Sequence, residues 1–285
     1  MLTKHLRFHR SDVPFFILSF TSNDMQQSAT QQGQGNPNAL TDQSYWTNYY
    51  GKHRQPDPNT ESIIATGSRL DHCWDETVKA AGEPKTIWEI GCYPGRYLAY
   101  VAARYGLRAM GLDFNQDTET VEKNLAAMGV ADYSAIQADF FTYMPEEKAD
   151  VVISLGFIEH FQDLDDVLDR HLNYLSASGA LFIIVPNMLG LIYSYKLLVD
   201  RANMDIHNLK AMKLSVYERF AARNNLKIKF LRYDGGFPAN VHQSLNLCQK
   251  LIYWPVRMLT KRAKPLLERH PSALYSSEIV ALFTR

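Results

Sequence analysis

IWEIGCYPGRY, residues 87–97, is the stretch that decides the fold: an apolar run reaches an acid, passes through two glycines and leads into a helical pattern. TIWEI (86–90) predicts a strand, and GRYLAYVAARYG (95–106) has the apolar spacing of a helix. Gly91 and Gly95 give the connecting turn backbone freedom, and the start of the helix offers free N–H groups. We therefore predict that this turn binds a ligand.

The sequence on either side of this turn alternates strand and helix signals. The apolar runs of the strands are nearly continuous, as in strands that are covered by helices on both faces. Further strands are predicted at 107–113, 133–139, 149–155, 179–187, 226–234 and 275–285, and helices at 116–129, 164–175, 190–200 and 208–225. The predicted fold class is α/β, a doubly wound, mostly parallel seven-stranded sheet.

A dinucleotide-binding protein would carry G-x-G-x-x-G at the first turn of such a sheet. If Gly91 is taken as the first glycine of this motif, the second and third motif positions are not glycine. If Gly95 is taken as its last glycine, the first and second positions are not glycine either. The spacing therefore tells against a nucleotide-binding oxidoreductase of Rossmann type, which is kept as an alternative.

The pattern E-x-G-x-x-x-G after an apolar strand resembles motif I of the class I S-adenosylmethionine-dependent methyltransferases. Three later strand ends follow that family's plan in the same order: GLDFN (111–115), QADFF (137–141) and ADVVISLGFIEHF (149–161). The resemblance covers residues 84–190 and implies a Rossmann-like methyltransferase fold. It also implies that S-adenosylmethionine is the methyl donor.

The resemblance assigns roles at the donor. Glu89 would position the amino group of the methionine part, Asp113 would accept hydrogen bonds from both ribose hydroxyls, and Asp139 would contact the adenine amino group with Phe140 packed on the ring. Tyr93, followed by Pro94, departs from the family's usual small residue, which leaves the path of the loop open. The donor-binding set is Glu89, Gly91, Cys92, Gly95, Asp113, Phe114, Asp139, Phe140 and Leu155.

Two residues of the segment GFIEHF, Glu159 and His160, are the candidate catalytic pair. His160 could remove a proton from an acceptor hydroxyl as a general base, or it could be a neutral histidine bonded to a backbone group. No metal is expected, because this segment alone lacks the three or four convergent ligands of a zinc site. Asn187 and His207 could reach the acceptor, although Asn187 is also an ordinary turn residue.

The N-terminal part divides into two segments. Residues 1–40 are predicted to be disordered, because their Gln/Gly/Asn-rich tract cannot pack a core, and translation could start at Met1 or Met25. Residues 41–83 are predicted to form a helical preface with helices over 42–53 and 62–81. Trp46 and Tyr50 lie on an aromatic face that either packs or closes as a lid over the donor.

Residues 84–285 form the predicted core, with substrate-shaping insertions around 188–225 and 236–272. The basic, partly apolar segment 250–271 either lies on a membrane surface or forms a solvated surface. Pro255 and Pro265 are expected to interrupt any long helix there.

The composition bounds the partners and the compartment. Thirty Lys and Arg balance thirty Asp and Glu, which gives no support to a nucleic acid partner. Three cysteines without a CxxC pair predict a reducing, cytoplasmic compartment. The expected activity is methyl transfer to an oxygen, with nitrogen less favoured, of a small molecule or a saccharide; a non-catalytic donor-binding module is a further alternative.

Overall fold

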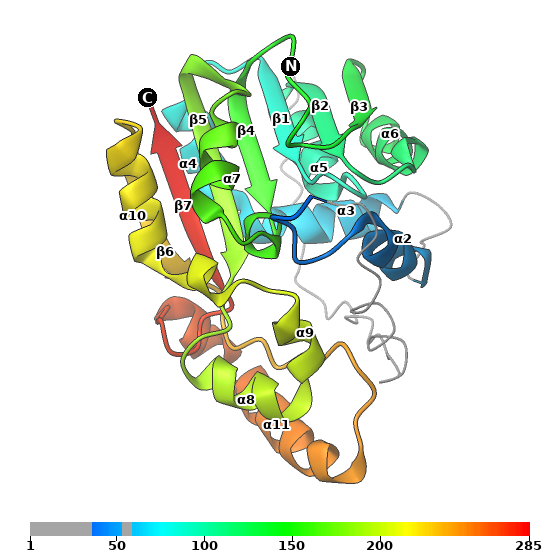
Figure 1. The fold of residues 1–285 in the computed structure, drawn as a ribbon, viewed down its shortest axis with the longest axis vertical. Coiled ribbons are helices and arrows are strands. Elements are labelled where there is room, and N and C mark those ends of the chain that lie inside the picture. Colours follow the sequence, from blue (N-terminus) through cyan, green and yellow to red (C-terminus); the bar gives the residue numbers. More distant parts are fainter. Residues whose placement is uncertain (1–35, 53–58) are drawn as a thin grey trace, which may run out of the picture.

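The architecture is a seven-stranded sheet with helices on both faces, in a computed structural model that describes residues 36–52 and 59–285 (Figure 1). The strand order is β3-β2-β1-β4-β5-β7-β6. The first five strands run parallel, and β7 is antiparallel to both of its neighbours. The strands are β1 (Thr86–Ile90), β2 (Arg108–Asp113), β3 (Tyr133–Gln137), β4 (Ala149–Leu155), β5 (Leu175–Pro186), β6 (Lys227–Asp234) and β7 (Glu278–Thr284). The predicted fold class is confirmed.

The core consists of two apolar layers, one on each face of the sheet. Successive residues of a strand point to opposite faces, so Ile87 and Trp88 of β1 enter different layers. One layer packs against α3 (Thr60–Gly67), α4 (Asp71–Ala80), α5 (Arg96–Tyr105) and α6 (Thr118–Ala127). The other layer packs against α7 (Leu164–His171) and α10 (Leu214–Arg223). These layers make the sheet a rigid platform for the loops at its carboxyl end.

The single helix predicted over 62–81 is interrupted by a 3-10 turn, Ser68–Leu70. Trp74 donates its indole N–H to the carbonyl of Gly67, at 2.9 Å. A Cβ on Gly67 would lie 2.1 Å from the ring of Tyr100, so only glycine lets this helix approach α5. The helix is therefore interrupted where it packs closely against α5. Helical periodicity alone did not predict this interruption.

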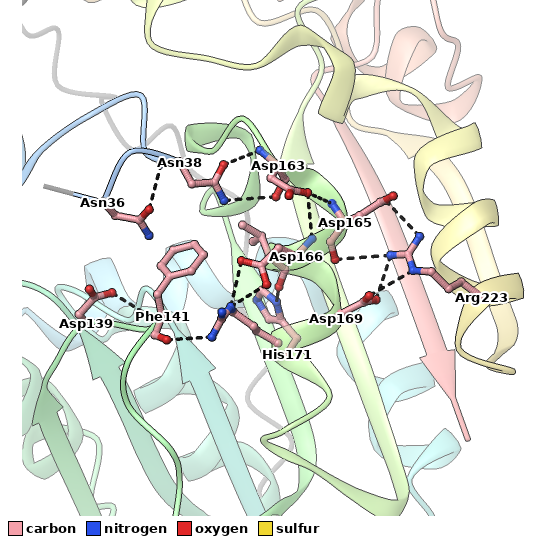
Figure 2. A network of polar contacts seen from close by, with 12 residues as sticks. Asn36, Asn38, Asp139, Phe141, Asp163, Asp165, Asp166, Asp169, His171 and Arg223 are labelled. Carbon is pink, nitrogen blue, oxygen red and sulfur yellow. Dashed lines mark hydrogen bonds and ion pairs between the residues drawn. The ribbon is translucent and has the colours of Figure 1, made fainter.

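Residues 36–40 are ordered, which corrects the boundary of the predicted disordered segment. Asn38 accepts a backbone hydrogen bond from Gln162 at 2.8 Å, and Leu40 donates one to the carbonyl of His160 at 2.7 Å. Figure 2 shows Asn38 against Asp163, at the start of α7. The segment is fixed here because its backbone groups pair with the loop after β4. Residues 1–35, and with them the choice between Met1 and Met25, lie outside the described residues.

The insertions expected after Pro186 contain α8 (Leu191–Val199), α9 (Arg201–Asp205), a 3-10 turn (Leu209–Met212) and α11 (Leu247–Arg269). Figure 1 shows α8, α9 and α11 grouped beyond the carboxyl ends of the parallel strands. Among the residues that the structure describes, no helix is both long enough and apolar enough to cross a bilayer.

The expectation that proline interrupts residues 250–271 is wrong, because α11 continues for 23 residues through Pro255 and Pro265. Both prolines are exposed, so water can solvate the carbonyls that lose an intrahelical donor. A capping box between Asn246 and Gln249 starts the helix. Packing of Tyr253 against α8 holds it in place.

Candidate functional site

The candidate site lies where β1 and β4 are neighbours, the point at which the strand order reverses. Ligands of doubly wound sheets bind beyond the carboxyl ends of the strands at this point. The turn after β1 has positive φ at Gly91 (71°) and at Gly95 (88°). A Cβ on Gly91 would lie 2.6 Å from the ring of Phe157, in the loop after β4. The two loops therefore meet closely enough to require glycine.

The carboxylate of Asp113, at the end of β2, is bonded to the turn itself. Its Oδ2 accepts a hydrogen bond from the Tyr93 N–H at 2.9 Å, and its Oδ1 accepts one from the Asn115 N–H at 2.8 Å. Burial raises the pKa of Asp113, while these backbone donors oppose the shift. The half-buried carboxylate thus has a fixed orientation at the strand end.

Glu89 contacts the helix that follows the turn. Its Oε2 accepts a hydrogen bond from the Leu98 N–H, in the first turn of α5, at 2.9 Å. Glu89 is 3% exposed, and burial raises its pKa well above the usual range, with Asp113 adding to the shift. In this position the side chain caps α5, so its contact with a donor amino group stays a prediction.

The residues expected near the adenine divide between the site and the core. Asp139 accepts a hydrogen bond from the Phe141 N–H, and Phe114, at the end of β2, is 44% exposed. Phe140 is 6% exposed and stacks on Tyr174 in the core, so its expected packing on the adenine ring stays a prediction. The direction in which the Phe140 side chain points depends on the local turn, and the periodicity of the sequence does not determine that turn.

The remaining two donor-binding candidates contribute in different ways. The side chain of Cys92 is buried, and a Cβ on Gly111 would lie 2.7 Å from its Sγ, so only the backbone of Cys92 can face a ligand. Leu155, the last residue of β4, is half-buried at the strand end.

The aromatic helix α2 (Gln43–Lys52) lies across this end of the sheet. The ring of Tyr50 is 4.5 Å from that of Tyr93, centroid to centroid, and the Tyr50 hydroxyl donates to the Tyr93 carbonyl at 3.4 Å. Trp46 packs edge-on against His160, with the centroids 4.8 Å apart. The Gln43 amide donates to the carbonyl of Phe114 at 3.1 Å. One helix thus touches the glycine turn, the end of β2 and the loop after β4.

His160 lies in that loop with its ring buried, 6% exposed. Its Nδ1 is 3.0 Å from the carbonyl oxygen of Ile206, which can only accept, so Nδ1 carries the proton and Nε2 presents a lone pair. Burial, reinforced by His207, lowers the pKa of His160 to about 3. Such an imidazole is a weak general base at neutral pH. The observed geometry is that of the second predicted role, a neutral histidine bonded to a backbone group.

Glu159 and His207 complete a cluster with His160. Glu159 Oε1 is 3.9 Å from His160 Nε2, and the centroids of the two imidazole rings are 4.8 Å apart. Glu159 is 1% exposed, and its Oε2 has no hydrogen-bond partner among the described residues. Burial raises the pKa of this carboxyl to about 8. A hollow of about 400 Å³ opens beside His207, lined also by Leu40, Gln162, Asp205, Asn208, Leu209 and Lys210.

The structure gives Asn187 the hydrogen bonds of a turn residue, the second of its two predicted roles. Asn187 is 1% exposed, its amide donates to the Ser276 carbonyl at 2.9 Å, and its Oδ1 accepts from Leu189 N–H. The side chain therefore fixes two chain segments to each other, and its contact with an acceptor stays a prediction.

The sequence analysis missed a buried charged network next to this region. Lys196 Nζ lies 2.9 Å from Asp200 Oδ2, and His242 Nδ1 lies 3.1 Å from the same oxygen. The side chains of Lys196 and Asp200 are 4% and 0% exposed. The four-residue spacing of Lys196 and Asp200 on one helical face was the available signal.

The chain was compared with known proteins. Residues 88–183 match the model of a family described as "Methyltransferase domain". A trans-aconitate 2-methyltransferase of Rhizobium rhizogenes is 28% identical over 102 residues, 35% of this chain and 38% of that protein. An ajmaline N-methyltransferase of Rauvolfia serpentina is 27% identical over 109 residues, 37% of each chain. The chain thus spans less than two fifths of the length of these relatives.

Solved structures share the fold. A SAM-dependent methyltransferase from Archaeoglobus fulgidus superposes with a TM-score of 0.52 at 16% identity, covering 85% of this chain and 100% of that chain. A putative sarcosine dimethylglycine methyltransferase from Galdieria sulphuraria gives 0.53 at 14% identity, covering 85% and 97%.

Proposed function

Because this chain carries a class I S-adenosylmethionine-dependent methyltransferase domain, we propose that it transfers a methyl group from S-adenosylmethionine to an oxygen of a small molecule or saccharide. Nitrogen is the less favoured acceptor atom. The observation that carries the proposal is the convergence of the glycine turn, Asp113 and the loop of His160 beneath α2.

The residues present fit the donor. The bare backbone at Gly91 and Gly95 gives a ligand close access, and Asp113 offers a fixed carboxylate to ribose hydroxyls. Glu89 would orient the methionine end through the start of α5, and Asp139 would contact adenine. When bound, the donor supplies an activated methyl group on a sulfonium. Tyr50 contacts Tyr93 of the turn, so we expect α2 to move when the donor binds.

The acceptor side supports an oxygen. The Nε2 lone pairs of His160 and His207 can accept a hydrogen bond from an acceptor hydroxyl and hold its oxygen toward the methyl group. Catalysis would come mainly from this positioning, since proximity alone can lower a barrier by roughly 7–11 kcal/mol. The names of the relatives, trans-aconitate and ajmaline methyltransferases, support a small-molecule acceptor.

Donor binding and methyl transfer test the proposal. Isothermal titration of the full chain is expected to show binding of S-adenosylmethionine and none of NADH. Donor labelled on its methyl group, incubated with the protein and a cell extract, is expected to label a low-molecular-weight or saccharide fraction. Binding of NADH without S-adenosylmethionine would favour the oxidoreductase, and donor binding without labelling of any extract would favour a non-catalytic module.

The same titration reports on α2. Since Trp46 packs on His160, movement of the helix is expected to change tryptophan fluorescence when the donor binds. A Trp46→Phe variant should bind the donor but lose most of that change. An unchanged signal in the variant would assign the change to another tryptophan and contradict the lid.

We also propose that the outer face of α11 contacts an anionic lipid surface. Leu247, Leu251, Trp254 and Met258 follow one another at helical spacing and are 81%, 77%, 57% and 52% exposed. The same helix carries six Lys and Arg residues and one Glu, whereas the whole chain is neutral. Exposed apolar residues flanked by cations fit the interface of an anionic bilayer.

Vesicle flotation checks this contact. The protein is expected to float with phosphatidylcholine vesicles that contain phosphatidylglycerol, and much less with phosphatidylcholine alone. Replacing Leu251 and Trp254 by serine should weaken binding about tenfold or more, because each buried large side chain contributes roughly 1.5–3 kcal/mol. Met144→Ser, at a residue 65% exposed in the loop after β3, is the control. Equal flotation of both variants, or a dimer that buries α11 in solution, would contradict the proposal.

A further inference from the structure

We propose that Glu159, His160 and His207 form a binding site for a divalent transition-metal ion. The segment GFIEHF supplies two of the three ligands, and the third comes from the turn after α9, about 47 residues along the chain. The sequence analysis expected no metal because it found no third ligand, and the fold supplies one. Binding of the ion is independent of the proposed function, and its role toward the acceptor rests on that function.

The ligand atoms already lie close together. One donor atom from each of the three residues lies within 4.8 Å of the others, and Glu159 Oε1 is 3.9 Å from His160 Nε2. Metal–ligand bonds of about 2.0–2.2 Å in a tetrahedron place ligand atoms roughly 3.4 Å apart. Small side-chain adjustments therefore suffice to close the three groups around an ion.

Both imidazoles have Nδ1 bonded to a backbone carbonyl. His160 Nδ1 donates to the carbonyl of Ile206 at 3.0 Å, and His207 Nδ1 donates to the carbonyl of Asn203 at 2.5 Å. Each Nε2 therefore carries a lone pair, in the tautomer that a metal requires. Such outer hydrogen bonds to carbonyls are the usual means of holding ligating histidines.

The carboxylate gives an independent indication. Glu159 Oε2 is buried and has no hydrogen-bond partner within residues 36–52 and 59–285. A buried carboxylate is costly unless it is paired with a cation or donors. A divalent ion bound by both oxygens of the carboxylate would satisfy the orphan Oε2.

The ligand set indicates the class of metal. Two imidazoles and one carboxylate suit Zn²⁺, Co²⁺, Mn²⁺ or Fe²⁺, whereas Mg²⁺ and Ca²⁺ prefer oxygen ligands alone. Three protein ligands leave a position open, as in catalytic sites. Of the three ligands, His207 lines the hollow described above.

In the metal-bound protein the open position, in place of the direct hydrogen bonds to the two Nε2 atoms, would bind the acceptor oxygen and lower the pKa of its hydroxyl. The hydroxyl proton passes to solvent water. An oxygen lone pair forms the new O–C bond as the S–C bond of the donor breaks, and the bonding pair stays on sulfur as S-adenosylhomocysteine.

A second group of potential ligands, His72, Cys73 and Asp234, provides a matched control. His72 Nε2 is already paired with Asp234 at 2.9 Å, and the His72 side chain is 51% exposed. In this second group the imidazole Nε2 is thus already bonded to a carboxylate, and no carboxylate oxygen is both buried and without a partner among the described residues.

Cobalt titration of the metal-stripped full chain tests the site through the visible absorption of bound Co²⁺. The wild type and His72→Gln are expected to bind one Co²⁺ with the same spectrum, displaced by Zn²⁺. His207→Gln and Glu159→Gln should each weaken that binding at least tenfold while keeping the wild-type far-ultraviolet circular dichroism. An absent spectrum in the wild type, or wild-type affinity in both ligand variants, overturns the proposal.

Titration of the metal-free protein with S-adenosylmethionine separates this inference from the proposed function. Binding of Co²⁺ without binding of the donor would overturn the proposed function and leave the metal site standing. Binding of the donor without Co²⁺ would do the reverse.

Discussion

Replacing Asp113 with alanine is expected to weaken the binding of S-adenosylmethionine by on the order of 100-fold. A hydrogen bond to a charged group contributes roughly 1.5–3 kcal/mol, and a factor of 100 corresponds to about 2.7 kcal/mol. The carboxylate also accepts the backbone N–H of Tyr93, so its loss loosens the turn that holds the methionine part. Isothermal titration of the purified variant measures the change.

Two further variants make this result specific. Asp113→Asn keeps one acceptor oxygen and should lose less affinity than Asp113→Ala. Asp117→Asn removes a charge from the same loop but keeps the cap of α6, since asparagine caps helices as well as aspartate does. Its donor affinity should stay near that of the wild type. Affinity of Asp113→Ala within threefold of wild type would show that no ribose is held at this strand end.

The framework of the site could be predicted from the sequence because it depends on local pattern. Strand ends are marked by the change from an apolar run to Glu89, Asp113 and Asp139, and parallel strands bring their carboxyl ends to one edge. Gly91 and Gly95 were identifiable because the turn needs positive φ at both. The predicted strands are all present, with boundaries that differ by a few residues.

The rest depends on contacts between residues far apart in the chain. Asn187 was left with two possible roles, at the acceptor or in a turn, because no pattern shows that residues 273–276 return to bind its amide. His207 was a lone histidine in the sequence, and its ring meets His160 only through the path of α9. The stacking of Phe140 on Tyr174 could not be predicted for the same reason. Periodicity gives the face of a strand, but it does not give the partner of a loop residue.

The proline residues of α11 illustrate a different error. Proline removes one backbone donor and disfavours a helix interior by roughly 3 kcal/mol, so a break was the reasonable expectation. The helix persists because its inner face buries Tyr253 against Tyr195 and Val199. The stabilisation of α11 by tertiary packing here exceeds the cost of proline to the helix. The apolar residues on the outer face of α11 stay exposed.

Replacing Gly91 with alanine is expected to destabilise the fold and abolish measurable donor binding. A residue with a Cβ at positive φ costs roughly 1–2 kcal/mol, and the new methyl group would lie 2.6 Å from the ring of Phe157. Forcing this half-buried ring aside adds about 1–3 kcal/mol. Urea unfolding should therefore show a loss of about 2–5 kcal/mol in the free energy of unfolding.

Gly82→Ala separates the two causes. Gly82 also has positive φ, 82°, but a Cβ there meets no atom within 4 Å. This variant should lose only the backbone part and bind the donor normally. In the double variant Gly91→Ala with Phe157→Leu, the smaller side chain should relieve the clash, so the two changes should couple favourably. Equal losses in the free energy of unfolding for Gly91→Ala and Gly82→Ala would mean that the loop after β4 can move away from the turn at no cost in free energy. The donor turn would then be held by its own conformation, and the contact with Phe157 would not help to join the donor and acceptor sides of the site.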